Sequence, residues 1–303
     1  MEYTMDDYVK SIVYDIRGEY VEKILNFRRQ TYYAIYRIAT NKDEYVMKLY
    51  NDEHKGDIEE KALYYLRKAS YIKVPKVYNI YEKNENIPYS AIIMEKISDG
   101  KILTKVPKKI QHRVVKDVID NIIFKENDYD LGSFGEIGKE KYSTWQEYYK
   151  KRAKEDTEKA KSLLINKRIN INTYLDVQDK YFNFDTIFRE PIERATLVHG
   201  NCSIDNIFFN EDGEAVALIN PHIAMYGDKE YETISLDKRK NNGLDILAEY
   251  KRRIPLSSNY EEKYEFYYLY DLIERNYSIL KSEIDKEKMS RKEKKIIKKY
   301  KYE

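Results

Sequence analysis

The sequence of 303 residues has a single cysteine, Cys202, which excludes an internal disulfide and a cysteine-based metal cluster. No stretch approaches the roughly 20 apolar residues of a membrane-spanning helix, so no transmembrane segment is expected. The first ten residues lack the apolar core of a secretion signal. The net charge is only +2, which gives no general case for binding nucleic acid. Together these absences predict a cytoplasmic protein in a reducing compartment.

The composition that is present is that of a globular protein. Apolar residues make up 42% and charged residues 36%, and the length allows one large core or two modest ones. Tyrosine is unusually common, with 32 residues. We interpret this excess as a coding bias and not as a sign of function.

The first third of the chain has the pattern of strands around a single helix. The helix is predicted at 57–69, where Ala62, Leu63 and Leu66 share one face and Asp57 is placed to cap the N-terminus. The predicted strands are Tyr20–Phe27, Tyr32–Thr40, Tyr45–Tyr50, Val77–Tyr81 and Tyr89–Ile97.

Beyond the turn at residues 98–100 the chain is mostly helical. Thr144 and Glu147 form a capping box that opens one of the predicted helices. The predicted helices are Val106–Phe124, Trp145–Leu164 and Glu261–Glu283, and the predicted strands are Ala195–His199, Ile207–Asn210 and Ala215–Ile219. Asp212-Gly213 between the last two strands is a strong hairpin signal. The pattern predicts an α+β fold with a β-rich lobe at 1–97, a helical lobe at 98–285 and a basic tail at 286–303.

The chemistry is concentrated in residues 197–232, LVHGNCSIDNIFFNEDGEAVALINPHIAMYGDKEYE. The segment is a strand, a polar loop, a hairpin and a second polar loop. Loops at the ends of neighbouring strands meet in space, so we expect His199, Asn201, Asn206 and Asn220 to converge. The amide oxygens of Asn206 and Asn220 are hard ligands of the kind that Mg²⁺ takes.

This segment resembles the catalytic region of aminoglycoside phosphotransferases, fructosamine kinases and protein kinases. These families have a loop of the form HGD or HRD, four residues and then asparagine, and HGNCSIDN matches it in length and at His199, Gly200 and Asn206. The catalytic aspartate of the family falls on Asn201. INPHIAMYGDKEYE looks like the fructosamine-kinase form of the second loop, and there the metal-binding aspartate falls on Asn220.

The rest of the chain agrees with the resemblance in order and spacing, over roughly residues 20 to 280. Lys48 matches the lysine that holds the phosphates of ATP, and Glu59 matches its partner on the helix. An ion pair between the two is therefore expected. The adenine-facing hinge falls on Met94, Glu95, Lys96 and Ile97. The phosphate loop, NFRRQTYYAI, contains no glycine, which departs from the family pattern.

The remaining polar residues of the segment have structural interpretations. The resemblance makes His199 a brace of the loop, neither a base nor a ligand. Asp205 is expected to brace the same loop, and Asp228 to cap or brace the loop after Gly227. Cys202 is expected to be a small buried residue.

The two asparagines and the glycine-free loop predict a pseudokinase with weak or no phosphotransfer and a binding or regulatory role. An active ATP- and Mg²⁺-dependent kinase of an aminoglycoside, a fructosamine or a similar molecule is the alternative, and a scaffold without nucleotide is a third. Asparagines introduced by an experimenter would leave the missing glycines unexplained. The pocket for the substrate carries no recognisable motif, so the sequence leaves its identity open, whether small molecule or protein partner.

The end of the chain is strongly basic. Residues 286–303 contain nine Lys or Arg and three Glu, which gives a net charge of +6. An exposed terminal helix is the simpler interpretation, and a docking site for an anionic partner or a membrane surface is the other.

Overall fold

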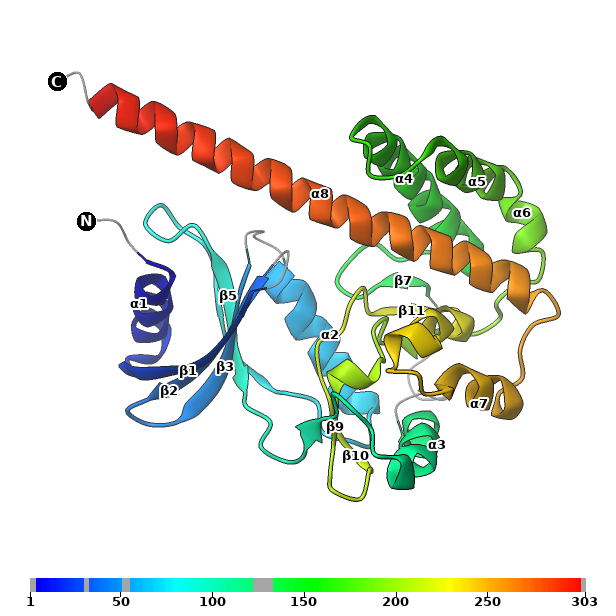
Figure 1. Ribbon diagram of the computed structural model, residues 1–303, viewed down its shortest axis with the longest axis horizontal. Helices are drawn as coiled ribbons and strands as arrows, with labels where there is room; N and C mark the ends of the chain where they lie inside the picture. The colour runs from blue at the N-terminus through cyan, green and yellow to red at the C-terminus, as the bar shows by residue number, and fades with distance from the viewer. Residues whose placement is uncertain (1–3, 30–32, 51–54, 122–132, 301–303) are drawn as a thin grey trace.

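The computed structural model describes residues 4–29, 33–50, 55–121 and 133–300, and it has the predicted α+β architecture (Figure 1). An antiparallel sheet near the N-terminus stands beside a mainly helical part. The five strands of this sheet run in the order β1-β2-β3-β5-β4. Their bounds are β1 Val21–Arg29, β2 Tyr33–Thr40, β3 Glu44–Tyr50, β4 Val77–Tyr81 and β5 Ser90–Glu95.

One helix covers each face of the sheet, α1 (Met5–Arg17) on one side and α2 (Lys55–Ala69) on the other (Figure 1). Side chains alternate between the faces of a strand. In β3, Met47 and Leu49 therefore pack in the core under α1, whereas Lys48 and Tyr50 point to the side of α2. The central strand, β3, therefore places Lys48 in the space between the sheet, α2 and the helical part.

Two expectations for this part of the chain are wrong. The first third contains α1 in addition to the single helix predicted, and Thr4 opens α1 with a capping box to Asp7. Asp57 is not an N-cap, because α2 begins at Lys55 and places Asp57 inside its first turn.

The helical part contains six α-helices and two small three-stranded sheets among the described residues. The helices are α3 Gln111–Asn121, α4 Trp145–Ile165, α5 Ile171–Phe182, α6 Phe184–Ile187, α7 Ile246–Arg253 and α8 Tyr260–Tyr300. The sheets are β10-β9-β6 and β7-β11-β8. Their strands are β6 Lys101–Ile102, β7 Gly135–Glu136, β8 Thr196–Val198, β9 Ile207–Phe209, β10 Ala215–Leu218 and β11 Met225–Gly227.

The predicted capping box of α4 is confirmed, with Thr144 and Glu147 bonded to each other's backbone. The helix expected from Val106 begins as the 3₁₀ turn Lys108–Ile110 and becomes α-helical only at Gln111. Its predicted end at Phe124 lies outside the described residues.

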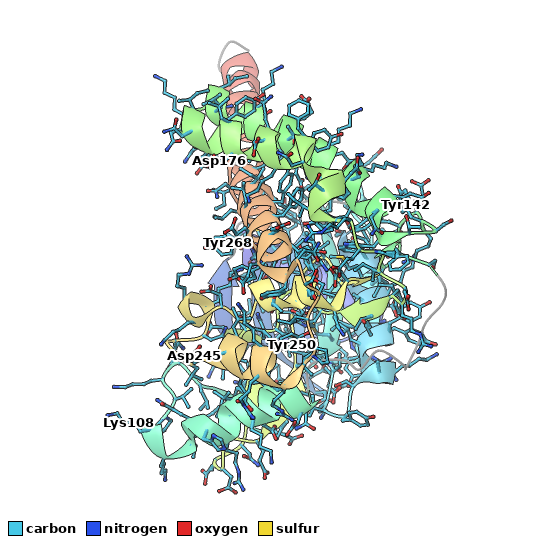
Figure 2. All side chains as sticks on the ribbon, turned by 90° about the vertical axis from the view of Figure 1, so that its right-hand side faces the viewer. Lys108, Tyr142, Asp176, Asp245, Tyr250 and Tyr268 are labelled. Carbon is cyan, nitrogen blue, oxygen red and sulfur yellow. The ribbon has the colours of Figure 1, made fainter. Side chains whose placement is uncertain are left out.

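Aromatic side chains fill the core between α4 and α8. Trp145 is fully buried and stacks on Tyr149 with ring centroids 4.9 Å apart. Its indole N–H donates to the Tyr267 hydroxyl over 2.9 Å, so the polar atom of this large side chain is satisfied inside the core. Figure 2 shows side chains packed between the helices of this part, with Tyr250 on α7 and Tyr268 on α8 labelled.

Helix α8 runs from the helical part to the side of the sheet, along the long axis of the molecule (Figure 1). The basic stretch that begins at residue 286 continues this helix as far as Tyr300. Within the described residues, no helix is both long enough and apolar enough to cross a membrane.

Candidate active site

Lys48 is the buried cation at the junction of sheet, helix and loops. Its side chain is 4% exposed, and its ammonium group forms an ion pair with Glu59 of α2. The other oxygen of Glu59 accepts a hydrogen bond of 2.6 Å from the Tyr50 hydroxyl. The predicted ion pair is therefore present, and Tyr50, which the sequence analysis did not single out, holds the carboxylate in place.

Lys48 also reaches the loop that follows β10. Its ammonium donates to Oδ1 of Asn220 over 2.9 Å. The Tyr33 hydroxyl donates to the same oxygen over 3.0 Å, and the ring of Tyr33 lies 4.8 Å from the ammonium. These contacts tie the N-terminal sheet to the loop that carries Asn220.

The three predicted asparagines form a closed ring of hydrogen bonds. Nδ2 of Asn220 donates to Oδ1 of Asn206 over 3.0 Å, and Nδ2 of Asn206 donates to the carbonyl of Asn201 over 2.9 Å. Nδ2 of Asn201 returns to the carbonyl of Asn220 over 3.2 Å. Asn220 has a φ of 59°, a left-handed conformation that asparagine tolerates better than most residues. The predicted convergence of the two loops is confirmed.

His199 lies at the start of the first loop and is fully buried. Burial lowers the pKa of its imidazole to about 4, so the ring is neutral at physiological pH. The backbone makes the brace, because the carbonyl of His199 accepts from the N–H of His222 over 3.1 Å. Gly200 has a φ of 74°, and a Cβ at this position would overlap the carbonyl oxygen of His222. Only glycine allows the two loops to approach this closely.

Glu232, which is not among the predicted site residues, orders the first loop. Its carboxylate accepts from the backbone N–H groups of His199 over 2.7 Å, Gly200 over 2.9 Å and Cys202 over 3.2 Å. The expected brace, Asp205, is instead exposed. The available signal was the second glutamate of Glu-Tyr-Glu, close after the Tyr-Gly-Asp motif.

The loop after Gly227 is anchored to α8, as the interpretation of Asp228 requires. Asp228 accepts from the N–H of Glu230 over 2.9 Å and caps the 3₁₀ turn Lys229–Ile234. Lys263 of α8, which is 2% exposed, pairs with Asp228 over 2.5 Å and with Glu230 over 2.7 Å. Lys263 was not predicted, because a lysine in a long charged helix gives no sign of being buried.

The predicted hinge residues lie at and after the end of β5. Met94 is buried there, and Glu95 accepts from Lys73 over 2.9 Å. Lys96 pairs with Glu44, and Ile97 is half-buried. Contact with adenine stays a prediction. The glycine-free loop falls partly on residues 30–32, which lie outside the described residues.

Asn206 and Asn220 suit a metal only in part. In the described part of the chain no group of three or more His, Cys, Asp or Glu side chains is placed to hold a metal ion. The two amides supply oxygen ligands without negative charge, and both oxygens already accept hydrogen bonds. A divalent ion here would depend on the phosphates of a bound nucleotide for its charge.

The described helices, strands and loops have the arrangement of known phosphotransferases. An apo structure of the aminoglycoside phosphotransferase APH(4)-Ia matches with a TM-score of 0.70 and 18% identity, over 91% of this chain and 93% of that one. A second match is a protein of Haemophilus somnus 129PT, which is provisionally named a fructosamine-3-kinase. Its structure matches with a TM-score of 0.62 and 18% identity, over 90% of both chains. These likenesses establish the kinase-like fold.

The sequence comparisons narrow the assignment from a shared fold to a family. A probable ketoamine kinase of Enterococcus faecium is 22% identical over 242 residues, which are 78% of this chain and 83% of that protein. The model of the fructosamine kinase family matches residues 28–282, which include Lys48, Glu59 and the whole asparagine ring. The chain therefore belongs to the fructosamine kinase family.

Proposed function

We propose that the protein is an ATP-dependent kinase that phosphorylates a hydroxyl group of a small ketoamine- or sugar-type molecule. The observation that carries the proposal is the buried set of Lys48, Glu59 and Asn220, which joins the sheet to the loops inside the family match. The comparisons favour this alternative over the pseudokinase that the asparagines alone predict, because the relatives carry the names of small-molecule kinases.

Lys48 is the group proposed to hold the nucleotide. A buried ammonium fixed by Glu59 presents a positive charge to phosphate oxygens at small entropic cost, since the side chain is already ordered. A solved relative, APH(4)-Ia, is held in a ternary complex with AMP-PNP and hygromycin B, which supports a cleft for both a nucleotide and a small molecule.

Asn201 is the group proposed to meet the substrate. An amide cannot take the proton of the attacking hydroxyl, but it can orient that hydroxyl by a hydrogen bond. Phosphoryl transfer depends mainly on positioning and charge neutralisation, whereas loss of a general base costs about 10²–10⁴-fold. The expected outcome is slow transfer.

Mg²⁺ would neutralise charge on the transferred phosphate when it is bound. Asn206 and Asn220 are the residues proposed to face it through their amide oxygens. The orientation of Asn220 opposes this role, because its amide nitrogen and not its oxygen faces Asn206. This observation keeps the pseudokinase as the second candidate, with a scaffold as the third.

Thermal unfolding with ATP, with and without Mg²⁺, separates the three candidates. The kinase predicts stabilisation by ATP that grows when Mg²⁺ is added. Stabilisation by ATP that Mg²⁺ leaves unchanged would favour the pseudokinase, and no stabilisation at all would favour the scaffold. The Lys48→Met variant is the matched control, because it removes the proposed phosphate contact.

We also propose that the β-rich lobe ends at residue 97 and that the helical lobe ends at residue 285. Contact of the basic end of α8 with an anionic partner also stays a prediction. Neither bears on the phosphate-transfer site.

A further inference from the structure

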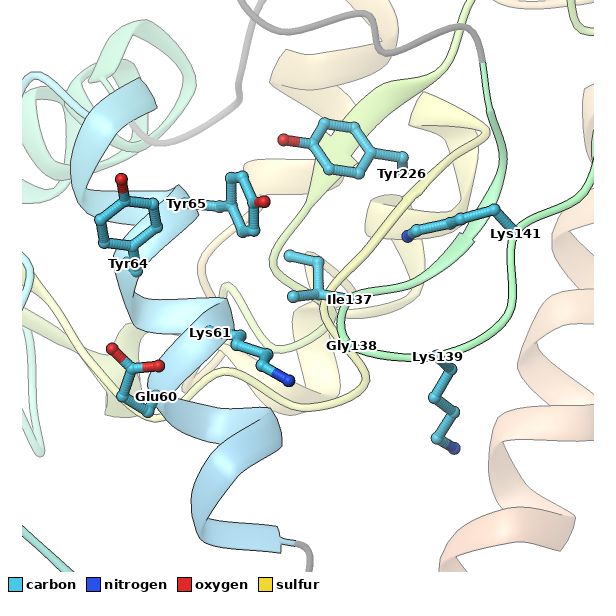
Figure 3. Close-up of a pocket in the computed structure, with 9 residues that line it drawn as sticks. All are labelled: Glu60, Lys61, Tyr64, Tyr65, Ile137, Gly138, Lys139, Lys141 and Tyr226. Carbon is cyan, nitrogen blue, oxygen red and sulfur yellow. The ribbon is translucent and has the colours of Figure 1, made fainter. Parts of the chain in front are cut away.

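A cavity of about 440 Å³ lies between α2 and the segment 137–141 (Figure 3). Its volume is within the range of pockets that bind small molecules. None of the residues that line it is Lys48, Glu59 or one of the ring asparagines. The side chains that define its chemistry are Lys61, Tyr64, Tyr65, Lys139, Lys141 and Tyr226.

The lining of the cavity is basic. It contains three lysines and one acidic residue, Glu60. Lys139 is paired with Glu136. Among the residues that the structure describes, neither Lys61 nor Lys141 has a carboxylate at ion-pair distance. Two lysines therefore line the cavity without an ion pair, although the charge of Glu136 still acts on Lys141.

Lys141 is held in place without being neutralised. Its ammonium donates to the backbone carbonyls of Gly135 over 3.2 Å and Glu136 over 2.9 Å. Burial lowers the pKa of this lysine, which indicates that its charge has lost solvation that the carbonyls and the nearby charge of Glu136 do not fully replace. An anion beside the ammonium would compensate for this lost solvation.

Tyrosine rings form the other wall. The rings of Tyr64 and Tyr65 lie 5.4 Å apart, and those of Tyr65 and Tyr226 lie 6.1 Å apart in edge-to-face contact. The ammonium of Lys141 lies 5.5 Å from the centre of the Tyr226 ring, so cation and aromatic wall adjoin. Aromatic faces pack against the C–H faces of sugar rings, and lysines bind phosphate oxygens as point charges.

The cavity bridges α2 to the helical part of the molecule. Gly138 has a φ of 81°, and a Cβ there would lie 3.4 Å from the side chain of Lys61. The neighbouring Ile137 is buried, and its N–H donates to the carbonyl of Ala224 over 2.9 Å. A ligand between these walls touches the helix that also carries Glu59.

We propose that this cavity binds a phosphorylated sugar, and that the bound ligand holds α2 where Glu59 pairs with Lys48. The phosphate contacts Lys61 and Lys141, and the sugar ring packs on the tyrosines. The ligand then strengthens nucleotide binding by fixing the carboxylate that orders Lys48. Only this regulatory step depends on the proposed kinase function.

The binding step is tested by calorimetry on the full chain without nucleotide, at constant ionic strength, with fructose 6-phosphate, fructose and inorganic phosphate as probes. Fructose 6-phosphate is expected to bind more tightly than either part alone. Lys61→Gln and Lys141→Gln each weaken it about five- to tenfold. Lys161→Gln, an exposed lysine of α4, leaves it unchanged.

Two results overturn the site. One is fructose 6-phosphate binding that Lys61→Gln leaves intact and Lys48→Met abolishes, because the ligand then occupies the cleft. The other is binding no tighter than that of inorganic phosphate. Lys61 is exposed, so its variant is expected to fold even if Lys141→Gln does not.

The regulatory step is tested by the affinity for AMP-PNP. Saturation with fructose 6-phosphate is expected to tighten it about fivefold or more, and Lys61→Gln is expected to remove the gain. An unchanged affinity overturns the regulation. If AMP-PNP does not bind under any condition, the proposed function and this regulation fail, while the binding step is judged by its own measurement.

Discussion

The ammonium of Lys48 donates to the side-chain oxygen of Asn220 over 2.9 Å, and together with the Tyr33 hydroxyl on the same oxygen it fixes which way the amide faces. With its oxygen on Lys48, Asn220 must present its nitrogen to Asn206. Rotating the amide would offer two oxygens to a metal, but it would also turn an N–H₂ group toward the ammonium. An aspartate avoids this conflict, because one carboxylate oxygen can accept from Lys48 while the other faces the metal.

Asn220→Asp is therefore expected to raise the affinity for Mg²⁺ in the presence of ATP, and Asn201→Asp with Asn220→Asp to raise it at least as much. Without metal, the added carboxylates repel each other and lower the melting temperature. With Mg·ATP, the rise in melting temperature should exceed that of the wild type. Thermal unfolding with and without Mg·ATP measures both effects.

Asn86→Asp, at an exposed position in the loop before β5, is the control for added charge alone. It should leave the response to Mg·ATP unchanged. If the double variant responds no better than this control, the defect lies in the nucleotide pocket itself. The glycine-free phosphate loop would then be the first suspect.

The pair of Lys48 and Glu59 is expected to matter for stability as well. Its side chains are 4% and 12% exposed, so removing one partner leaves a charge with little solvent around it. Lys48→Met or Glu59→Met should cost about 3 kcal/mol of unfolding free energy. The double variant Lys48→Met with Glu59→Met should cost less than the sum, and urea unfolding of the three variants gives the comparison. Additive losses would show that the two side chains do not interact.

Glu232 is expected to hold the asparagine loop through its charge. The carboxylate accepts hydrogen bonds from three backbone N–H groups. A hydrogen bond to a charged group contributes about 1.5–3 kcal/mol to stability. Glu232→Gln should therefore lower the unfolding free energy by about 2 kcal/mol and increase hydrogen exchange at residues 199–202.

Glu211→Gln, at an exposed position in the turn between β9 and β10, is the matched control and should change neither quantity. Loss of stability without faster exchange in the loop would contradict the assigned role of Glu232.

Strands and loops of the site could be predicted because their signals are local. The hairpin of β9 and β10 follows from Asp212-Gly213, and the meeting of Asn206 with Asn220 follows from the strands that carry them. Tyr33, Glu232 and Lys263 could not be predicted in the same way. Each acts through a partner far away in sequence, and tyrosine, glutamate and lysine are common enough here that position alone gives no signal.

The terminal elements show the same limit. Helix α1 has a capping box and buried Val9, Ile12 and Val13, but these signals lie in a short segment directly before a run of strands and were not predicted as a helix. Helix α8 joins the predicted helix Glu261–Glu283 to the terminal helix expected at 286–303, so one helix runs through Tyr300 where two separate segments were expected.

Stability is expected to rise with pH between about 4 and 6.5. Burial lowers the pKa of both His199 and His222 to about 4, whereas an unfolded histidine titrates near 6.5. In this pH window the two histidines bind protons in the unfolded chain but stay neutral in the folded chain, so lowering the pH favours unfolding. Asp156 acts in the opposite direction, because burial raises its pKa to about 6, but one carboxyl offsets only one histidine. His222→Gln should flatten the rise in a melting temperature profile from pH 4 to 7, and an unchanged slope would contradict the lowered pKa of His222.

The most direct test is the transfer of labelled γ-phosphate from ATP to a fructosamine, with Mg²⁺ and purified protein. The wild type is expected to form phosphorylated product slowly, the variant with Asn201→Asp and Asn220→Asp to form it about 10²–10⁴ times faster, and Lys48→Met to form none. Product with the wild type above the Lys48→Met background supports a working kinase. If the wild type forms no product while it still binds ATP, the proposed kinase is wrong and the protein is a pseudokinase.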